Sequence, residues 1–213
     1  MIRVLIADDH TIVRDGLRHL LVAAGDIDVR AEARNGLEVI EHVRKTAFDV
    51  LLTDMSMPGT SGIELIRQVH AERPKLRILV LSMHEEHQYA VRAIRAGASG
   101  YLTKESATLQ LVEAIRRVAA GGAFISAEVA QQLALGAMPN ATGPLHECLS
   151  DREFQIFMLI AGGVSVSDIA AQLFLSVKTV STHKSNIFQK MRITTQTELI
   201  RYALTHRLLE PRA

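Results

Sequence analysis

The chain has 213 residues, with 24 Lys and Arg against 23 Asp and Glu, so its formal net charge is +1. Hydrophobic residues make up 48% and charged residues 22%, which excludes a wholly disordered or collagen-like chain. The apolar runs are short and the N-terminus turns acidic at Asp8, so we expect neither a membrane span nor a signal peptide. A single cysteine, Cys148, excludes an internal disulfide and favours a cytoplasmic location. The near-neutral charge argues, at first sight, against nucleic-acid binding.

Five short aliphatic runs alternate with helical patterns over the first 125 residues. Between the first two runs, apolar residues recur at helical spacing at Val13, Leu17 and Leu21. Strands that are mostly apolar are typical of a parallel sheet covered by helices on both faces. We therefore predict an α/β unit with a five-stranded parallel sheet. The expected strands are Arg3–Ala7, Val29–Ala33, Val50–Thr53, Ile78–Leu81 and Gly100–Leu102.

The pattern changes after two glycines at 121–122. One more helix is expected over Ala127–Leu135, and residues 136–144 then contain two glycines, two prolines and no charge, which is typical of a linker. Beyond the linker only helical patterns occur, and we predict four helices. Ser150 and Glu153 have the spacing of a capping box and predict the start of the first of these helices.

Polar residues follow the ends of the predicted strands. Asp8 and Asp9 end the first strand, Asp54 the third and Ser82 the fourth, and Lys104 comes just after the fifth. The carboxyl ends of parallel strands meet at one edge of the sheet, so these side chains should converge. Three carboxylates favour Mg²⁺, and a lysine and a hydroxyl add partners for a phosphoryl group. Each residue alone could be a helix cap or turn residue, but five at successive strand ends favour a single site.

These residues, together with the run from Asp54 to Gly59 and Gly62, resemble the receiver domain of bacterial two-component response regulators. The resemblance implies a flavodoxin/CheY-like fold and phosphorylation of Asp54 by a sensor histidine kinase. It also implies roles for the other residues of the site. Mg²⁺ would be bound by Asp8 (through water), Asp9, Asp54 and the main-chain carbonyl of Ser56, Lys104 would stabilise the transferring phosphoryl group, and Ser82 and Tyr101 would form the switch pair.

Glu105 and Ser56, which lie near the predicted site, differ from the residues that two known families have at these positions. Many receivers have a cis-proline after the lysine, whereas Glu105 follows Lys104 here, which leaves the isomer of that bond open. Phosphatases of the haloacid dehalogenase type need a second aspartate two positions after the nucleophile. Ser56 occupies that position and cannot act as a general acid, so we expect no phosphatase and no enzyme of another kind.

The third C-terminal helix is predicted to begin after Ser176 and to be cationic. Residues 176–192 hold four Lys or Arg and no acid, and no Asp or Glu occurs between Asp168 and Glu198. Small hydroxyl side chains on its polar side would let a helix backbone lie deep in a major groove. A solvated amphipathic surface is the alternative. The side chains expected to pack inward are Val177, Val180, the stem of Lys184, Ile187 and Met191.

Residues 150–206 resemble the helix-turn-helix domain of NarL/FixJ/LuxR-type regulators. The motifs that carry this resemblance include Leu149 to Glu153, Leu175-Ser176 and Lys178-Thr179-Val180 with His183. By this resemblance, the bases of double-stranded promoter DNA would be read by Ser181, Thr182 and Ser185, and phosphates would be contacted by Lys178, Thr179 and Lys184.

The sequence therefore predicts a DNA-binding transcriptional response regulator that acts as a homodimer when phosphorylated. We expect a receiver at 1–122, a helix and flexible linker at 123–145, and an all-α helix-turn-helix domain at 146–213. Two alternatives stay open: a DNA-binding regulator whose receiver is only a protein-interaction module, and a phosphate sink with a vestigial DNA domain.

The net charge conceals an asymmetry between the two halves of the chain. Residues 1–139 contain 16 Lys and Arg against 17 Asp and Glu, and residues 140–213 contain 8 against 6. The small total charge is therefore compatible with nucleic-acid binding by the second half.

Overall fold

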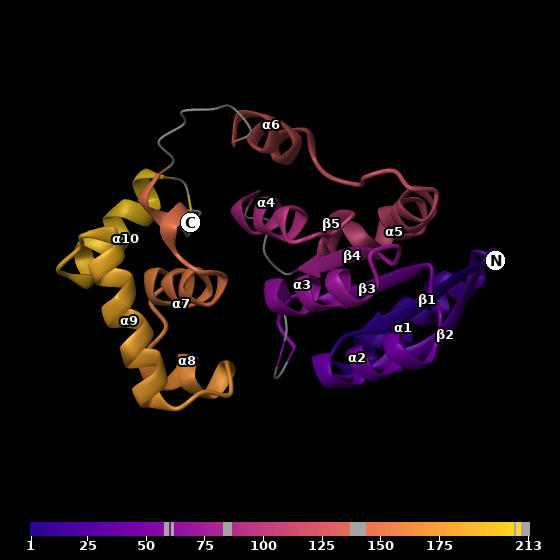
Figure 1. The fold of residues 1–213 in the computed structure, drawn as a ribbon, viewed down its shortest axis with the longest axis horizontal. Helices are drawn as coiled ribbons and strands as arrows, with labels where there is room; N and C mark the ends of the chain where they lie inside the picture. Colours follow the sequence, from indigo (N-terminus) through magenta and orange to yellow (C-terminus); the bar gives the residue numbers. More distant parts are fainter. Residues whose placement is uncertain (58–59, 61, 83–86, 137–143, 207, 210–213) are drawn as a thin grey trace. The chain divides into compact units, whose positions relative to one another are not determined.

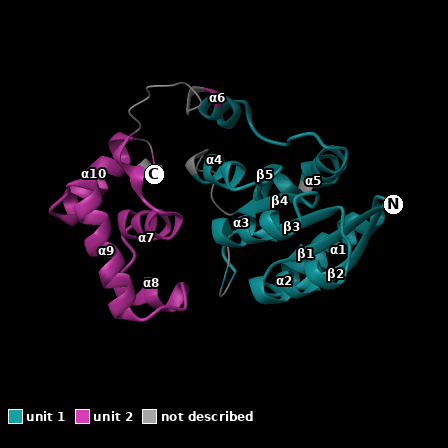
Figure 2. Cartoon of the chain, in the orientation of Figure 1, with its two compact units in different colours: residues 1–133 teal, residues 134–213 magenta. Residues whose placement is uncertain are grey.

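The computed structural model describes residues 1–57, 60, 62–82, 87–136, 144–206 and 208–209. The chain divides into two compact units, residues 1–133 and 134–213 (Figure 2). Residues 137–143, which make up most of the expected flexible linker, lie outside the described residues. Among the described helices, none has the length and apolar character that crossing a membrane requires.

The first unit is built on a five-stranded parallel sheet with the strand order β2-β1-β3-β4-β5 (Figure 1). The order reverses between β1 and β3, which is where such sheets bind ligands. Each predicted strand is confirmed to within two residues at either end. The strands are β1 (Ile2–Ala7), β2 (Ile27–Ala33), β3 (Val50–Asp54), β4 (Arg77–Ser82) and β5 (Gly100–Thr103).

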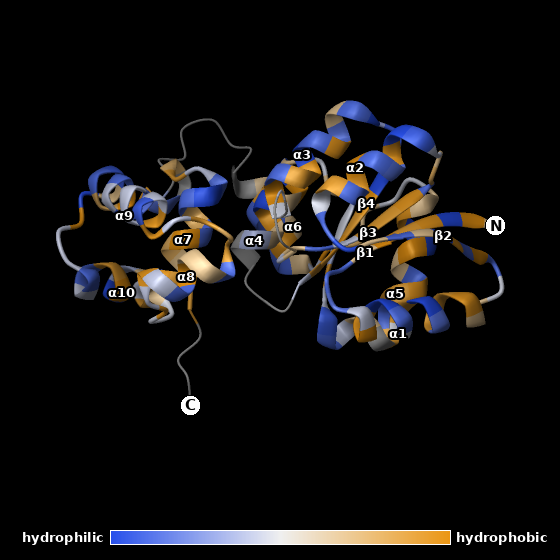
Figure 3. Cartoon of the chain, turned by 90° about the horizontal axis from the view of Figure 1, so that it is seen from below, coloured by the Kyte–Doolittle hydropathy of each residue, from blue (hydrophilic) through white to orange (hydrophobic). Residues whose placement is uncertain are grey.

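Helices cover both faces of this sheet (Figure 3). On one face lie α1 (Thr11–Ala23) and α5 (Lys104–Ala119), whose Leu21 and Ile115 pack into one core cluster with Ile6 and other strand residues. The other face is covered by α2 (Gly36–Lys45), α3 (Gly62–Glu72) and α4 (His87–Arg95). In the central strands β1, β3 and β4, nearly all successive positions are buried, because both faces of the sheet are covered, and this explains why these strands are so apolar.

The segment after α5 adds to the first unit. The Phe124 carbonyl accepts a hydrogen bond from the Tyr101 N–H at 2.9 Å, and the Phe124 N–H donates to the Ser99 carbonyl at 3.1 Å, beside β5. The helix α6 (Ala127–Gly136) matches the predicted helix, and its Val129 packs against Ala90 of α4. The expected domain boundaries at 122 and 145 stay predictions.

The second unit is all-helical and has its own core. It consists of a short 3₁₀ turn η1 (Leu145–Cys148) and the helices α7 (Asp151–Ala161), α8 (Val166–Gln172), α9 (Val177–Met191) and α10 (Gln196–Thr205). Phe154, Phe157 and Ile169 are fully buried in this core. The predicted capping box is confirmed, because Ser150 and Glu153 each accept a hydrogen bond from the other's backbone N–H. The four predicted helices are therefore present, and η1 was not predicted.

Gly36 allows the loop after β3 to approach the start of α2. A Cβ on Gly36 would lie 1.8 Å from the main-chain carbonyl oxygen of Thr60, so one backbone must move. We expect Gly36→Ala to lower the free energy of unfolding by about 1–3 kcal/mol, the usual cost of forced overpacking. Urea-induced unfolding of the full chain measures this change.

Gly16 provides the matched control within α1. A Cβ there would meet no atom within 4 Å. Gly16→Ala should therefore raise the free energy of unfolding by about 0.5–1 kcal/mol, because alanine restricts the unfolded chain and favours the helix. Equal effects of the two substitutions would contradict the close approach at Gly36.

Candidate functional site

Asp8, Asp54 and Lys104 meet at the carboxyl edge of the sheet, as the strand-end pattern predicts. Asp8 follows β1, Asp54 ends β3, and Lys104 opens α5 directly after β5. The Lys104 Nζ lies 2.6 Å from Asp8 Oδ2 and 3.3 Å from Asp54 Oδ1. Asp8 is 0% exposed and Asp54 is 4% exposed, so two buried carboxylates share one ammonium group. The Lys104–Glu105 bond is trans, since no described peptide bond is cis.

The electrostatics of this cluster follow from burial and from the charge balance. Burial raises the pKa of the Asp54 carboxyl above its usual value; the Lys104 ammonium opposes this effect and the charge of Asp8 adds to it. Burial also opposes the charge of Lys104, but its bond to Asp8 and the charges of Asp54 and Asp8 raise its pKa overall. Lys104 therefore stays protonated and holds the two carboxylates together.

Asp9 supplies an oxygen suited to a cation. Its Oδ1 atom is buried and accepts no hydrogen bond. His10 Nδ1 lies 2.9 Å from this oxygen, outside hydrogen-bond geometry, and 3.3 Å from Asp8 Oδ1. One ligand atom from each of Asp8, Asp9 and His10 falls within 4.8 Å of the others. Together with Asp54, these carboxylates outnumber the single ammonium of Lys104, and such an oxygen-rich, net-negative pocket fits a hard divalent cation.

The other predicted residues of the pocket lie in or just after the strands β3, β4 and β5. Ser82 ends β4, is 1% exposed, and pairs with Thr103, the residue before Lys104. The Ser56 backbone lowers the pKa of the Asp54 carboxyl and so acts against the effect of burial. The half-buried Tyr101 packs against the cluster formed by α4 and α6. The roles predicted for Ser56, Ser82 and Tyr101 stay predictions.

Arg14 belongs to this site although the sequence patterns did not single it out. It is only 3% exposed. Its guanidinium donates to the main-chain carbonyl of Asp8 at 2.7 Å, to Thr11 Oγ1 at 3.2 Å and to the Glu32 carboxylate at 3.3 Å. A buried arginine needs such partners to offset its desolvation. Arg14 thus fixes the backbone corner from which Asp8 projects.

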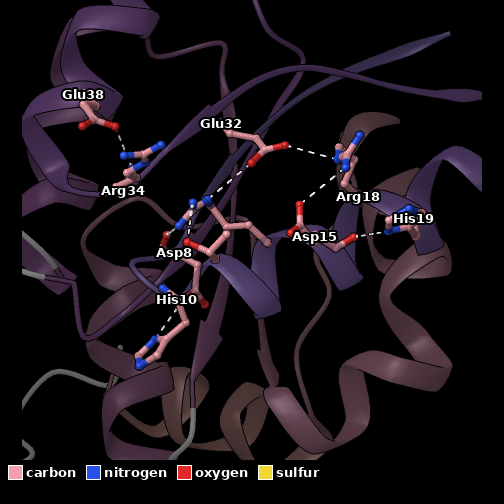
Figure 4. Close-up of polar contacts among 10 residues, drawn as sticks. Asp8, His10, Asp15, Arg18, His19, Glu32, Arg34 and Glu38 are labelled. Carbon is pink, nitrogen blue, oxygen red and sulfur yellow. Dashed lines mark hydrogen bonds and ion pairs between the residues drawn. The ribbon is translucent and has the colours of Figure 1, made fainter.

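Figure 4 shows Glu32 between this corner, marked by Asp8, and Arg18, which lies 3.4 Å from the Glu32 carboxylate.

One signal in the sequence could have revealed Arg14. It precedes the buried Leu21 by seven residues, two helical turns, and so lies on the inward face of α1. An arginine at such a position requires a polar partner inside the fold.

The exposed side of α9 carries hydroxyl side chains, as the sequence predicts. Ser181, Thr182 and Ser185 are all exposed. Thr182 Oγ1 donates to the Lys178 carbonyl at 3.0 Å, and Ser185 Oγ donates to the Ser181 carbonyl at 3.1 Å. Since these hydroxyl protons are used within the helix, the oxygens face outward as acceptors. Thr179 has a different position, because its N–H and Oγ1 both bond the N-cap residue Ser176.

Two of the four cations in this segment are engaged by neighbouring side chains. Lys190 Nζ lies 2.7 Å from the buried Glu153 carboxylate of α7, and Lys184 Nζ bonds Gln196 Oε1 at 3.2 Å. Burial opposes the charge of Glu153, but its bonds to Lys190 and Ser150 lower the pKa of its carboxyl. The Glu153–Lys190 pair, which sequence reasoning missed, joins α7 to the end of α9.

The prediction that Val177 packs inward is wrong. Val180, Ile187 and Met191 are at most 1% exposed, as predicted, whereas Val177 is 51% exposed. It is the first residue of α9, so no preceding turn of the helix covers it. The inward face of α9 is complete without it.

Comparison with known proteins gives the family of the chain. Residues 4–116 match the response regulator receiver domain, and residues 147–203 match the luxR family of bacterial regulatory proteins. The chain belongs to the two-component response regulators. Its luxR-type domain makes this chain a DNA-binding transcription regulator, not an enzyme.

Relatives of this response regulator match it along its whole length. The response regulator UvrY of Escherichia coli K12 is 39% identical over 209 residues, covering 98% of this chain and 96% of UvrY. The response regulator GacA of Pseudomonas viridiflava is 37% identical over 214 residues and covers both chains completely.

Solved structures of the response regulator RcsB are similar as well. The RcsB–DNA complex is 29% identical, covers 96% of this chain and 98% of that chain, and has a TM-score of 0.59. RcsB of Salmonella enterica serovar Typhimurium bound to promoter P1flhDC with the phosphomimetic BeF₃⁻ is 27% identical, with the same coverage and a TM-score of 0.66.

The shared ammonium predicts opposite effects of two substitutions on stability in metal-free buffer. Lys104→Ala leaves Asp8 and Asp54 buried without a counter-charge and should lower the free energy of unfolding by about 3–5 kcal/mol. Asp54→Asn removes a carboxylate that burial disfavours and should raise it by about 1–2 kcal/mol. Urea-induced unfolding at neutral pH in EDTA measures both effects.

The destabilisation caused by Lys104→Ala should depend on pH, and an exposed lysine provides the control. Because the pKa of Asp54 is raised in the folded chain, acidification toward that pKa neutralises the carboxylate and should reduce the cost of Lys104→Ala. Lys45→Ala, which removes an exposed pair with Glu41, should change stability by less than about 1 kcal/mol. Equal stability of Lys104→Ala and the wild type would contradict the shared-ammonium interpretation.

Proposed function

We propose that Asp54 accepts a phosphoryl group from a sensor histidine kinase in a reaction that needs Mg²⁺. The observation that supports this proposal is the convergence of Asp8, Asp54 and Lys104, with the Lys104 ammonium between the two buried carboxylates. Asp8, Asp9, Asp54 and the Ser56 carbonyl are the proposed Mg²⁺ ligands, with Asp8 acting through water. The finer roles rest on the resemblance of this pocket to that of receiver domains.

The chemistry assigns each residue a separate task. An Asp54 carboxylate oxygen attacks the phosphorus of the kinase phosphohistidine; the phosphorus–nitrogen bond breaks as the acyl phosphate forms, and the imidazole leaves with its electron pair. Bound Mg²⁺ would neutralise charge on the transferring oxygens. Lys104 binds a phosphoryl oxygen, and the Ser82 hydroxyl binds another once the group has arrived. The Tyr101 ring then follows Ser82 inward.

Phosphorylation would act by shifting a conformational equilibrium toward a homodimer. A phosphoryl group changes that equilibrium only by its differential stabilisation of the two states, and reversal from 1:99 to 99:1 takes about 5.5 kcal/mol. The proposed partner of the dimer is double-stranded promoter DNA in the cytoplasm, with two half-sites about one helical turn apart. The RcsB–DNA complexes support this part of the proposal.

On the DNA, α9 would occupy the major groove. Ser181, Thr182 and Ser185 are the proposed base readers, since they are exposed and present acceptor oxygens that amino groups of bases can donate to. Proposed phosphate contacts come from Lys178, Thr179 and Lys184. A second candidate, a regulator that binds DNA without phosphorylation, uses the same helix but leaves Asp54 unmodified.

Labelling with acetyl phosphate tests the phosphoacceptor. The wild-type chain with Mg²⁺ should incorporate the phosphoryl group, and Asp54→Ala should abolish incorporation because the attacking oxygen is gone. Intact-mass measurement detects the added group. Asp15→Ala, which changes an aspartate of α1 whose side chain is 51% exposed, is the control and should label like the wild type. Undiminished labelling of Asp54→Ala would remove Asp54 from this role, and an unlabelled wild type would favour the phosphorylation-independent regulator.

Salt-dependent DNA binding tests α9. Lys178 is exposed, so Lys178→Ala should weaken binding to all sequences and flatten the plot of log affinity against log salt by about one unit. Lys190→Met is the matched control, because its ammonium is held by Glu153. It should lower stability and leave the salt slope unchanged. An unchanged slope for Lys178→Ala would exclude Lys178 from the phosphate contacts.

A further inference from the structure

Val177 is an apolar side chain that the fold leaves in water. Its exposed fraction is 51%, although the apolar side chains Val180, Ile187 and Met191 of the same helix are at most 1% exposed. The core of the second unit is therefore closed without Val177. A β-branched residue also has lower helix propensity than most alternatives at the start of a helix. Neither packing nor helix formation explains the valine at this position.

The position of Val177 relates it to the polar face of α9. Val177 is the first residue of the helix, directly after the N-cap Ser176. It begins a row at i, i+4 and i+8 that continues with Ser181 and Ser185, and all three residues are exposed. In helix-turn-helix proteins, the N-terminal residues of the recognition helix are those that reach base edges. Val177 thus lies at the end of α9 that enters the groove deepest.

The chemistry of the row divides base recognition between two kinds of group. The Ser185 hydroxyl donates to the helix backbone and offers an acceptor, which suits the amino groups of adenine and cytosine. Val177 has no polar atom and can recognise only an apolar feature. In the major groove that feature is the 5-methyl group of thymine. We infer that Val177 contacts a thymine methyl group and is a specificity-determining residue; this rests on the proposed placement of α9 in the groove.

The charge around Val177 selects DNA over an apolar protein surface. Lys178 follows it directly, and no Asp or Glu occurs between Asp168 and Glu198. A protein partner that covered Val177 would have to desolvate the neighbouring ammonium, whereas DNA supplies a phosphate for it. A single DNA duplex therefore contacts both the Val177 side chain and the Lys178 ammonium.

A double-mutant cycle, which combines Val177→Ala in the protein with replacement of thymine by uracil in the DNA, tests the inference. The probe is a duplex selected by the full-length protein from random sequences, and each thymine is replaced singly by deoxyuridine, which lacks only the methyl group. With wild-type protein, one replacement in each half-site should lower affinity about four-fold, the effect of one buried methyl group. Val177→Ala should lose about four-fold on the thymine duplex and nothing further on that uracil duplex. Fluorescence anisotropy measures each dissociation constant.

Control variants separate this inference from the proposed function. Leu204→Ala removes an apolar side chain of similar exposure on α10 and should bind thymine and uracil duplexes with the wild-type ratio. Thermal unfolding should show a Tm for Val177→Ala that is no lower than that of the wild type. If Val177→Ala loses as much affinity as the wild type when thymine is replaced by uracil, the two effects are additive and the inference is overturned. An unchanged salt slope in Lys178→Ala would instead count against the placement of α9, independently of the uracil result.

Discussion

The receiver pocket depends on the ion pairs that the Lys104 ammonium group makes with two buried carboxylates. The ammonium joins Asp8, which follows β1, to Asp54, which ends β3, and both aspartates lie far from Lys104 in the sequence. Without a cation, carboxylates crowded at one sheet edge repel each other, and burial increases the cost of each charge. One ammonium offsets part of this charge and leaves the pocket negative. The pocket can therefore fold and keeps a net negative charge that a divalent cation would offset.

The same arrangement explains how a phosphoryl group could change the conformation. Lys104 stabilises the pocket through two carboxylates, and the proposed phosphorylation of Asp54 would convert one of these carboxylates into an acyl phosphate with more oxygens and more charge. A lysine that already lies 3.3 Å from Asp54 needs little movement to follow the new charge. Under the proposed function, the energetic difference between the two states would arise where the phosphoryl group meets Lys104 and the buried Ser82.

The predictable part of the site is the part that topology determines. Asp8, Asp54 and Lys104 were predicted to converge because strand ends alone place them, and no detail of side-chain packing is needed. Arg14 was missed because its role depends on the rotation of α1 about its axis, which decides whether an arginine faces Glu32 or solvent. Val177 was predicted wrongly because helical periodicity does not account for the end of a helix, where the neighbouring turn that would cover a side chain is missing.

For the cationic helix α9, too, the number of charged residues in the sequence differs from the number of charges that the structure leaves available. The segment carries four positive charges, yet Lys190 is held by the Glu153 carboxylate, so fewer cations are available for phosphates than the count implies. Affinity for DNA changes with salt by a factor that depends on the number of phosphates neutralised, with a slope of about −0.9 for each. A unit with few available cations binds weakly alone, and pairing two units doubles the number of phosphate contacts. Under the proposed function, control of dimerisation by the receiver would control promoter occupancy, because each α9 helix alone offers few cations to the DNA phosphates.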